Sequence, residues 1–381
     1  MSRALARNEV HDTSLAARLH ARIAKDGPVT VEAFMQACLS DTASGAYASR
    51  QPIGGKGDFI TAPEISQIFG ELLGVWAVTV WQSMGAPHSL IVAELGPGRG
   101  TLMADALRAW RGVPKFLESV AVAMVETSPV MAETQREALR DTAVPLRWYA
   151  KLDAVPDGPL IVLANEFVDA LPVRQFVRRG NTWRERSVVN DDRGGFAFAE
   201  GDAATPEVSD LAHAAPDGTI LETRPAALPL LRELGRRAAR YGLAALIIDY
   251  GHEETGFGDT VQAVRGHRFA DPLANLGAAD LSAQVDFADL KRHAGAFGLN
   301  AYGPVPQGEF LLKLGFGERR ERLLQRAKSS QVAAIASGAW RLVDPMQMGV
   351  LFKVLALTSA ELASPPPFGP AISLYLRDRP W

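Results

Sequence analysis

Residues 90–102 read LIVAELGPGRGTL, and this stretch decides the fold of the chain. A short apolar run ends in an acid, and Gly96, Gly98 and Gly100 then lead into a helical pattern. This order predicts a strand, a tight turn and a helix N-terminus, the place where an α/β sheet presents its backbone to a ligand. The expected fold is therefore α/β, with a doubly wound sheet and a binding loop.

The spacing of the glycines and the acid before them bear on the kind of ligand. A dinucleotide fingerprint places its third small residue where Thr101 stands, whereas this chain has the glycine one position earlier. A nicotinamide oxidoreductase is therefore disfavoured. The carboxylate of Glu94 would accept hydrogen bonds from an ammonium group and repel a pyrophosphate. S-adenosylmethionine, which carries a sulfonium and an α-ammonium, fits this loop better.

A second acid strengthens the prediction of a cofactor. Residues 119–125 are mostly apolar with β-branched side chains, which predicts a strand, and Glu126 ends the run. A carboxylate at this place can accept hydrogen bonds from two ribose hydroxyls. Glycine loops after strands often serve only as turns, but Glu94 and Glu126 together favour cofactor binding.

Composition limits the partners. The 381 residues suffice for one large domain with insertions or for two domains. The formal net charge is −3 and the arginines are scattered, so we expect no nucleic acid partner. No apolar run approaches the roughly 20 residues that span a bilayer, and the N-terminal residues show no signal-peptide core or cleavage site. We therefore expect no membrane insertion and a cytoplasmic location, while the oligomeric state stays open.

The single cysteine and the histidines give no sign of a metal. Cys38 alone excludes an internal disulfide and a multi-cysteine zinc site, and its apolar helical context predicts a core position. The histidines do not fall at metal-ligand spacing.

Helical periodicity at 14–24 and 31–38 predicts a helical N-terminal cap over residues 1–56, followed by a catalytic domain over 57–381. A helix is expected from residue 61 to about 80, with Thr61 and Glu64 three apart as a capping box. Asp58 lies before this helix, so the capping motif does not explain it.

The apolar run 160–164 predicts a buried strand that ends at Asn165, Glu166 and, slightly later, Asp169. Ligands bind outside the carboxyl ends of such strands, so these side chains should emerge beside Glu94 and Glu126. Other expectations are an antiparallel β insertion at about 173–223, a long loop at 256–283, helix from 310 to 336 and a last strand at 371–376.

Several blocks carry a resemblance to a known family. They are GDFITAPEISQIFGE from residue 57, ELGPGRGTL from 94, NEFVDALPV from 165, LIIDYGH from 246 and MGVLFKV from 348. Together they resemble the MidA family of S-adenosylmethionine-dependent methyltransferases, whose mitochondrial members are known as arginine methyltransferases and assembly factors for respiratory complex I.

The resemblance implies a class I methyltransferase fold, which is Rossmann-like, with S-adenosylmethionine as cofactor. It also implies symmetric dimethylation of an arginine in a protein substrate, such as a complex I subunit. Gly96, Gly98 and Gly100 match the cofactor loop of the family, and Asn165, Glu166 and Asp169 match its motif after the fourth strand. Residues 190–218 have no clear counterpart.

The chemistry of arginine methylation suggests catalytic roles for the acidic residues. A guanidinium stays protonated and becomes nucleophilic only where its charge is drawn toward other nitrogens, which a bidentate carboxylate can do. Glu166 is the first candidate, Asp169 the second and Asp58 the third, with Asn165 in the cofactor site. Asn165 could instead cap a helix, and Asp169 could be a first-turn acid. A non-catalytic assembly chaperone remains the rival function, although it would need no intact cofactor loop.

Overall fold

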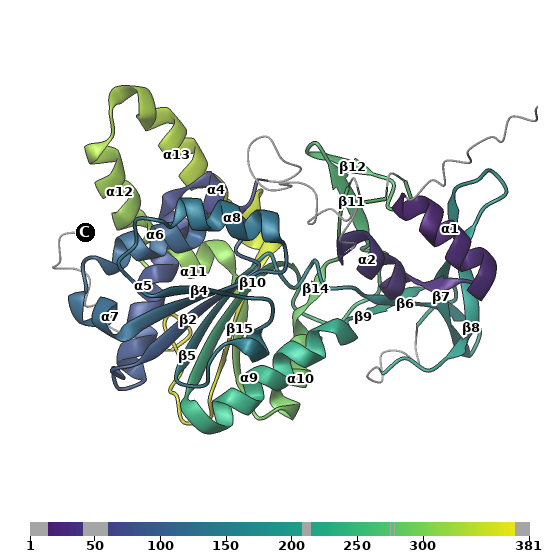
Figure 1. The fold of residues 1–381 in the computed structure, drawn as a ribbon, viewed down its shortest axis with the longest axis horizontal. Helices are drawn as coiled ribbons and strands as arrows, with labels where there is room; N and C mark the ends of the chain where they lie inside the picture. The colour runs from purple at the N-terminus through teal and green to yellow at the C-terminus, as the bar shows by residue number, and fades with distance from the viewer. Residues whose placement is uncertain (1–13, 41–59, 208–214, 275, 278, 370–381) are drawn as a thin grey trace, which may run out of the picture.

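The computed structural model describes residues 14–40, 60–207, 215–274, 276–277 and 279–369. Figure 1 shows a larger α/β part, in which helices flank a central sheet, and a smaller β-rich part that carries the N-terminal helices. Asp58, the strand expected at 371–376 and the boundary expected near residue 56 lie outside the described residues.

The central sheet has the strand order β15-β16-β10-β5-β2-β3-β4, with β14 beside β10. Its strands are β2 (Leu90–Leu95), β3 (Val120–Val125), β4 (Leu146–Tyr149), β5 (Leu160–Asn165), β10 (Leu243–His252), β14 (Val285–Asp286), β15 (Asn300–Pro306) and β16 (Phe352–Thr358). Strands β10, β5, β2, β3 and β4 are parallel, whereas β16 runs antiparallel to β10 and β15. The carboxyl ends of β2, β3 and β5 therefore meet at one edge of the sheet, as the sequence predicted.

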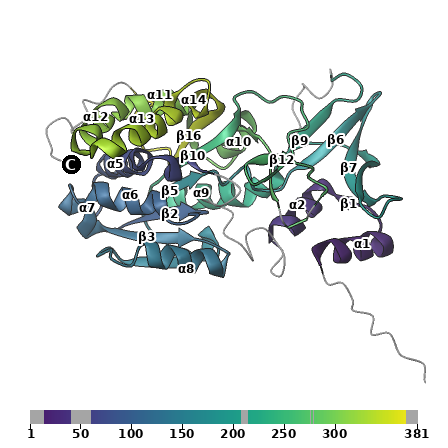
Figure 2. The same cartoon turned by 90° about the horizontal axis from the view of Figure 1, so that it is seen from above.

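Helices cover both faces of this sheet. They are α4 (Ala62–Ile65), α5 (Gln67–Ser83), α6 (Thr101–Trp110), α7 (Pro114–Ser119), α8 (Pro129–Ala138), α9 (Leu228–Tyr241), α10 (Phe287–Ala296), α11 (Gln307–Lys313), α12 (Phe316–Arg326), α13 (Ser329–Val343) and α14 (Met348–Leu351). One apolar core joins the sheet to α5, α6, α11 and α13, and a second joins its other face to α9 and α10. Figure 2 shows α11, α12 and α13 on the same side of the sheet as α5. The doubly wound architecture is confirmed.

Glycines allow α5 and α6 to pack closely. A Cβ added at Gly74 would lie 2.8 Å from Cα of Ala106, and one at Gly70 would lie 2.8 Å from the carbonyl oxygen of Leu102. Only a residue without a side chain permits such an approach. This close packing fixes the position of α6 in the domain. It thereby also fixes one end of the loop between β2 and α6.

The smaller part is built from antiparallel strands. They are β1 (Val29–Thr30), β6 (Arg174–Arg179), β7 (Thr182–Asn190), β8 (Phe196–Ala204) and β9 (Ile220–Thr223). Their order is β1-β7-β6-β9, with β8 paired to β7, so the hairpins predicted for this stretch are confirmed. Helices α1 (Leu15–Asp26) and α2 (Val31–Ser40) share an apolar core with this sheet. Cys38 is buried in that core, as predicted.

Three local predictions were wrong. The helix expected from residue 61 is broken into α4 and α5 because Ser66 adopts an extended backbone and caps α5. Residues 256–283 are not an irregular loop, since β11 (Gln262–Arg265), β12 (Arg268–Ala270) and β13 (Asp280–Ser282) form a small antiparallel sheet. The long helix expected at 310–336 is divided into α11, α12 and α13.

Candidate active site

The loop between β2 and α6 has the backbone that its glycines predict. Gly96, Gly98 and Gly100 have φ values of 58°, 53° and 82°, the left-handed region that favours glycine. At Gly96 a side chain has no room either, because a Cβ would lie 2.9 Å from Cδ2 of Phe167. The loop is tied to α8, where Gln135 donates from Nε2 to the carbonyl of Gly98 at 2.8 Å. Because its glycines carry no side chains, a ligand can approach the backbone of this loop closely at the carboxyl ends of the strands.

Glu94 is a buried acid with an unmet hydrogen-bond requirement. Its side chain is 3% exposed, and burial raises its pKa well above the ordinary value. Atom Oε2 has no hydrogen-bond partner within the described part of the chain. A cation beside this group would favour its ionised form and give the free oxygen a partner, so the position suits a positively charged ligand group.

Glu126 follows β3 and is held by its own neighbours. Its Oε1 accepts the backbone N–H of Ser128 at 2.7 Å, and its Oε2 accepts from Nε2 of Gln135 at 3.0 Å. Burial raises its pKa, and these hydrogen bonds oppose the rise. The carboxylate is thereby oriented, and each oxygen keeps further acceptor capacity for a ribose hydroxyl.

Asn165 and Glu166 lie together at the carboxyl end of β5. Oε1 of Glu166 accepts from the backbone N–H of Ala62 at 3.1 Å and from Nδ2 of Asn165 at 3.2 Å. Glu166 has φ 50°, which is uncommon for a residue with a side chain. Burial, and secondarily the charge of Asp169, raises its pKa to about 7. Oδ1 of Asn165 has no partner among the described residues, so a polar atom again faces the site unsatisfied.

One pocket brings most of the predicted site residues together. Its lining consists of Thr61, Pro63, Glu64, Glu94, Gly96, Pro97, Gly98, Arg99, Thr101, Leu102, Asn165 and Glu166. Gly100, Glu126 and Asp169 do not line it. The pocket therefore joins the β2–α6 loop to the end of β5 beneath α4.

Asp169 lies deeper than Glu166. It is buried beside Arg224 and Tyr250, and burial raises its pKa to about 6 although the positive charge of Arg224 lowers it. Its Oδ1 has no partner within the described residues. A shared carboxylate fork with Glu166 is therefore not visible, even though the charge of Asp169 acts on Glu166.

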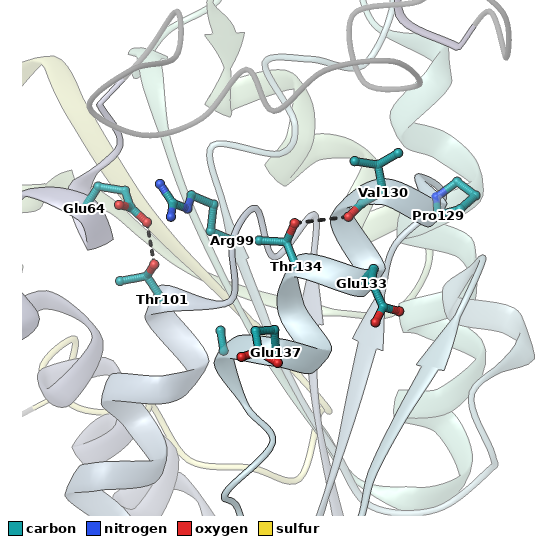
Figure 3. Close-up of a pocket in the computed structure, with 9 residues that line it drawn as sticks. Glu64, Arg99, Thr101, Pro129, Val130, Glu133, Thr134 and Glu137 are labelled. Atoms are coloured by element: carbon teal, nitrogen blue, oxygen red, sulfur yellow. Dashed lines mark hydrogen bonds between the residues drawn. The ribbon is translucent and has the colours of Figure 1, made fainter.

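Glu64 and Thr101 line the site, although the sequence assigned Glu64 to a capping box. The side chain of Thr61 makes no capping hydrogen bond, and Glu64 accepts one from the hydroxyl of Thr101 at the start of α6. Figure 3 shows this bond near Arg99. Glu64 and Thr101 also line an open pocket with a volume of about 1020 Å³. Arg99 and residues of α8 line the rest of it. Pro63, the second residue of α4, was the one available sign of a short separate helix.

Metal and membrane features can be stated only for the described residues. No group of three or more His, Cys, Asp or Glu side chains in them could hold a metal ion. No helix in the same ranges is long and apolar enough to cross a membrane.

The cofactor implied by the sequence fits this site. The glycine loop is open to a close approach, Glu94 lacks a cation, and Asn165 offers an unsatisfied acceptor. Glu94 and the loop would hold the amino acid end of S-adenosylmethionine, and Glu126 its ribose. Three convergent features thus favour one cationic ligand.

Comparison with known proteins agrees with this geometry. Residues 72–305 match the Methyltransf_28 family, described as an S-adenosyl-L-methionine-dependent methyltransferase family. The protein arginine methyltransferase NDUFAF7 of Danio rerio is 36% identical, over 92% of this chain and 88% of that protein. The protein of the same name from Homo sapiens is 37% identical, over 91% and 83% of the two chains. Both relatives are named as mitochondrial.

A solved structure also relates this chain to methyltransferases. A COG1565 superfamily member from Burkholderia thailandensis, bound to S-adenosyl-homocysteine, superposes with a TM-score of 0.79 at 28% identity. The match covers 96% of this chain and 95% of that one. This chain belongs to the Methyltransf_28 family of S-adenosyl-L-methionine-dependent methyltransferases, together with the NDUFAF7 proteins.

Proposed function

We propose that this enzyme methylates an arginine side chain of a protein substrate, with Glu166 as the residue that binds the guanidinium. The observation that carries the proposal is the position of Glu166. It lines the same pocket as Glu94 and the glycine loop, and it is held there by Asn165 and by the first amide of α4. The names of the curated relatives support arginine as the acceptor.

Methyl transfer to arginine requires that the two reactants are held in line and that a negative charge lies beside the guanidinium. When bound, S-adenosylmethionine supplies a methyl group on a sulfonium. Glu166 binds the guanidinium, localises its positive charge and, with a pKa of about 7, is able to accept the proton that the nitrogen loses. Holding the reactants in line can supply about 7 to 11 kcal/mol of the barrier. Asp169 would raise the basicity of Glu166 through its charge.

The sequence resemblance makes a respiratory complex I subunit the first substrate to test and symmetric dimethylarginine the expected product. Cytoplasmic location in a bacterium belongs to the same proposal. The test incubates the enzyme with methyl-labelled S-adenosylmethionine and proteins from a strain that lacks its gene. Mass spectrometry then identifies the labelled residue. Label in symmetric dimethylarginine is expected. Label confined to another residue type contradicts the choice of acceptor, and cofactor binding without transfer favours the assembly chaperone.

A further inference from the structure

Arg224 is a buried cation that holds the loop carrying the candidate catalytic acids. It follows β9, is 8% exposed, and its guanidinium donates to four backbone carbonyls. Two belong to the loop between β5 and β6: Val168, and Leu171 at 2.9 Å. The other two, Ala283 at 2.8 Å and Gln284 at 2.9 Å, join β13 to β14. One side chain thus fastens the acid-bearing loop to a distant part of the chain.

Asp249 holds the same loop by its amides. This residue of β10 is 0% exposed. Its Oδ2 accepts the backbone N–H groups of Val168 at 2.9 Å and Asp169 at 3.0 Å. The loop is therefore bound through its carbonyls by Arg224 and through its amides by Asp249.

The strained backbone of Glu166 explains why the loop needs these contacts. Glu166 begins the loop with φ 50°, and such a backbone conformation is strained in a residue other than glycine. It persists only where the surroundings leave the chain no alternative. Without fixed partners after Glu166, the loop would relax and its carboxylate would turn away from the pocket.

We propose that Arg224 and Asp249 are positioning residues, which act through the loop 166–172 to aim Glu166 at the methyl acceptor and to keep Asp169 close behind it. The inference rests on the proposed function. Neither residue lines the pocket of the glycine loop, so their effect reaches the reaction through the backbone. Because Arg224 stands where the chain returns from the β-rich insertion, the end of that insertion is fixed to the catalytic loop.

Lysine cannot replace arginine in this role. The guanidinium presents five donors in a rigid plane, whereas an ammonium group is a compact charge with three donors. Arg224→Lys keeps the positive charge beside Asp169 but cannot span four carbonyls. The loop should loosen, and misplacement by about 1 Å can cost about a hundredfold in rate.

A matched control exists in the same domain. Arg237 of α9 is 0% exposed and donates to the carbonyls of Leu152 at 3.0 Å, Val155 at 2.6 Å and Pro156 at 2.9 Å. It is likewise buried and bound to backbone carbonyls, although its Nε also donates to Oε1 of Glu233 at 2.6 Å, and none of these partners belongs to the loop 166–172. Arg237→Lys should lower the melting temperature and leave turnover within about threefold.

The experiment compares wild type, Arg224→Lys and Arg237→Lys by three measurements. These are methyl incorporation at saturating S-adenosylmethionine into proteins from a strain lacking the gene, cofactor Kd by calorimetry, and melting temperature. Arg224→Lys should lose turnover by about tenfold or more while its cofactor Kd stays within about threefold. Equal turnover losses in both variants, unchanged turnover in Arg224→Lys, or a parallel loss of cofactor affinity would each overturn the inference.

A second pair covers the case in which Arg224→Lys does not fold. Asp249→Asn keeps an acceptor for the two amides and should retain most of the turnover, whereas Asp249→Ala removes it and should lose turnover with the cofactor Kd preserved. Full turnover in Asp249→Ala overturns the role of the pair. If wild type transfers no methyl group to any protein, the proposed function fails instead, so the two failures are distinct.

Discussion

The backbone N–H of Ala62 donates to Oε1 of Glu166 at 3.1 Å, although the two residues are 104 positions apart in the chain. This bond places the start of α4 on the candidate catalytic carboxylate. Glu64 of the same short helix accepts from Thr101 at the start of α6. The two contacts make α4 one wall of the pocket. The bond from Ala62 lowers the pKa of Glu166 against the stronger effect of burial, and the result is a carboxyl group that titrates near neutral pH.

Glu166→Gln tests whether this carboxylate binds and activates the acceptor. Glutamine keeps the size and one acceptor oxygen, so Ala62 retains a partner, but the charge that localises the guanidinium is lost. Methyl transfer should fall by about a hundredfold or more, with S-adenosylmethionine affinity within a few fold. Labelled-methyl incorporation and cofactor titration check this. Full transfer would remove Glu166 from catalysis, and loss of cofactor binding would reassign it to the cofactor site.

The pH dependence of transfer follows from the same residue. Glu166 has its pKa raised to about 7, so its ionised fraction grows as the pH rises through that value. If the ionised form binds the guanidinium, kcat/KM should climb between about pH 6 and 8 and then level off, because kcat/KM reports groups of the free enzyme. The rise should disappear in Glu166→Gln. A profile that is flat across this range in wild type would show that the ionisation of Glu166 does not limit the reaction.

Glu94→Gln should separate binding from stability. Burial raises the folded pKa of Glu94 above the ordinary 4.5, so the folded protein loses stability as the pH rises above that value. A neutral glutamine removes this loss, and the free variant should melt no lower than wild type at pH 8. Its S-adenosylmethionine affinity should fall, since a hydrogen bond to a charged group contributes about 1.5 to 3 kcal/mol. Calorimetry measures both. A variant that binds the cofactor as wild type does would contradict the assignment of Glu94 to the ammonium group.

The β2–α6 loop was predictable because its chemistry is local. Three glycines, an acid and an apolar run within 13 residues specify a strand, a turn and a helix with little help from the rest of the chain. Glu166 could be placed for the same reason, since only Asn165 separates it from the unbroken apolar run 160–164. Fold class and the common mouth of Glu94 and Glu166 followed from the rule that parallel strands end at one edge.

The rest of the site depends on contacts between distant residues. Glu64 fits a capping box by spacing, yet its partner is Thr101, 37 positions away. Arg224 resembles any arginine near a turn, and its four carbonyl partners lie 53 to 60 positions from it. Asp169 matches the motif but does not line the pocket, and its amide donates to Asp249, 80 positions away. The spacing of residues along the sequence does not indicate such contacts between distant residues.

Gly96→Ala should abolish or greatly weaken cofactor binding. The new Cβ would lie 2.9 Å from the ring of Phe167, so either the ring or the loop must shift, and the left-handed φ of 58° adds strain. Gly180→Ala is the matched control: its φ of 54° carries similar strain, but nothing lies within 4 Å of its Cβ and it is far from the pocket in sequence and fold. Gly180→Ala should lose about 1 kcal/mol of stability and Gly96→Ala at least as much, while only Gly96→Ala should lose cofactor affinity. Equal affinity in the two variants would refute the assignment of this loop.

Glu126→Ala should affect both the cofactor and the protein. The sequence suggests a residue free for ribose, so that folded stability would hardly change. The structure shows instead that Glu126 accepts from the amide of Ser128 and from Gln135, and that Gln135 in turn holds the carbonyl of Gly98. Removing the carboxylate leaves these donors without an acceptor, which costs about 1 to 3 kcal/mol of folding stability.

The same change should weaken S-adenosylmethionine binding, both through the lost ribose contacts and through a looser glycine loop. Glu126→Gln separates the two contributions, because the amide oxygen can still accept from Ser128 while the charge is gone. It should recover most of the melting temperature and only part of the affinity, as measured by calorimetry and titration. If Glu126→Ala melts lower yet binds the cofactor with wild-type affinity once folded, Glu126 is an acid that only orders α8 and the loop, and the ribose must be bound elsewhere.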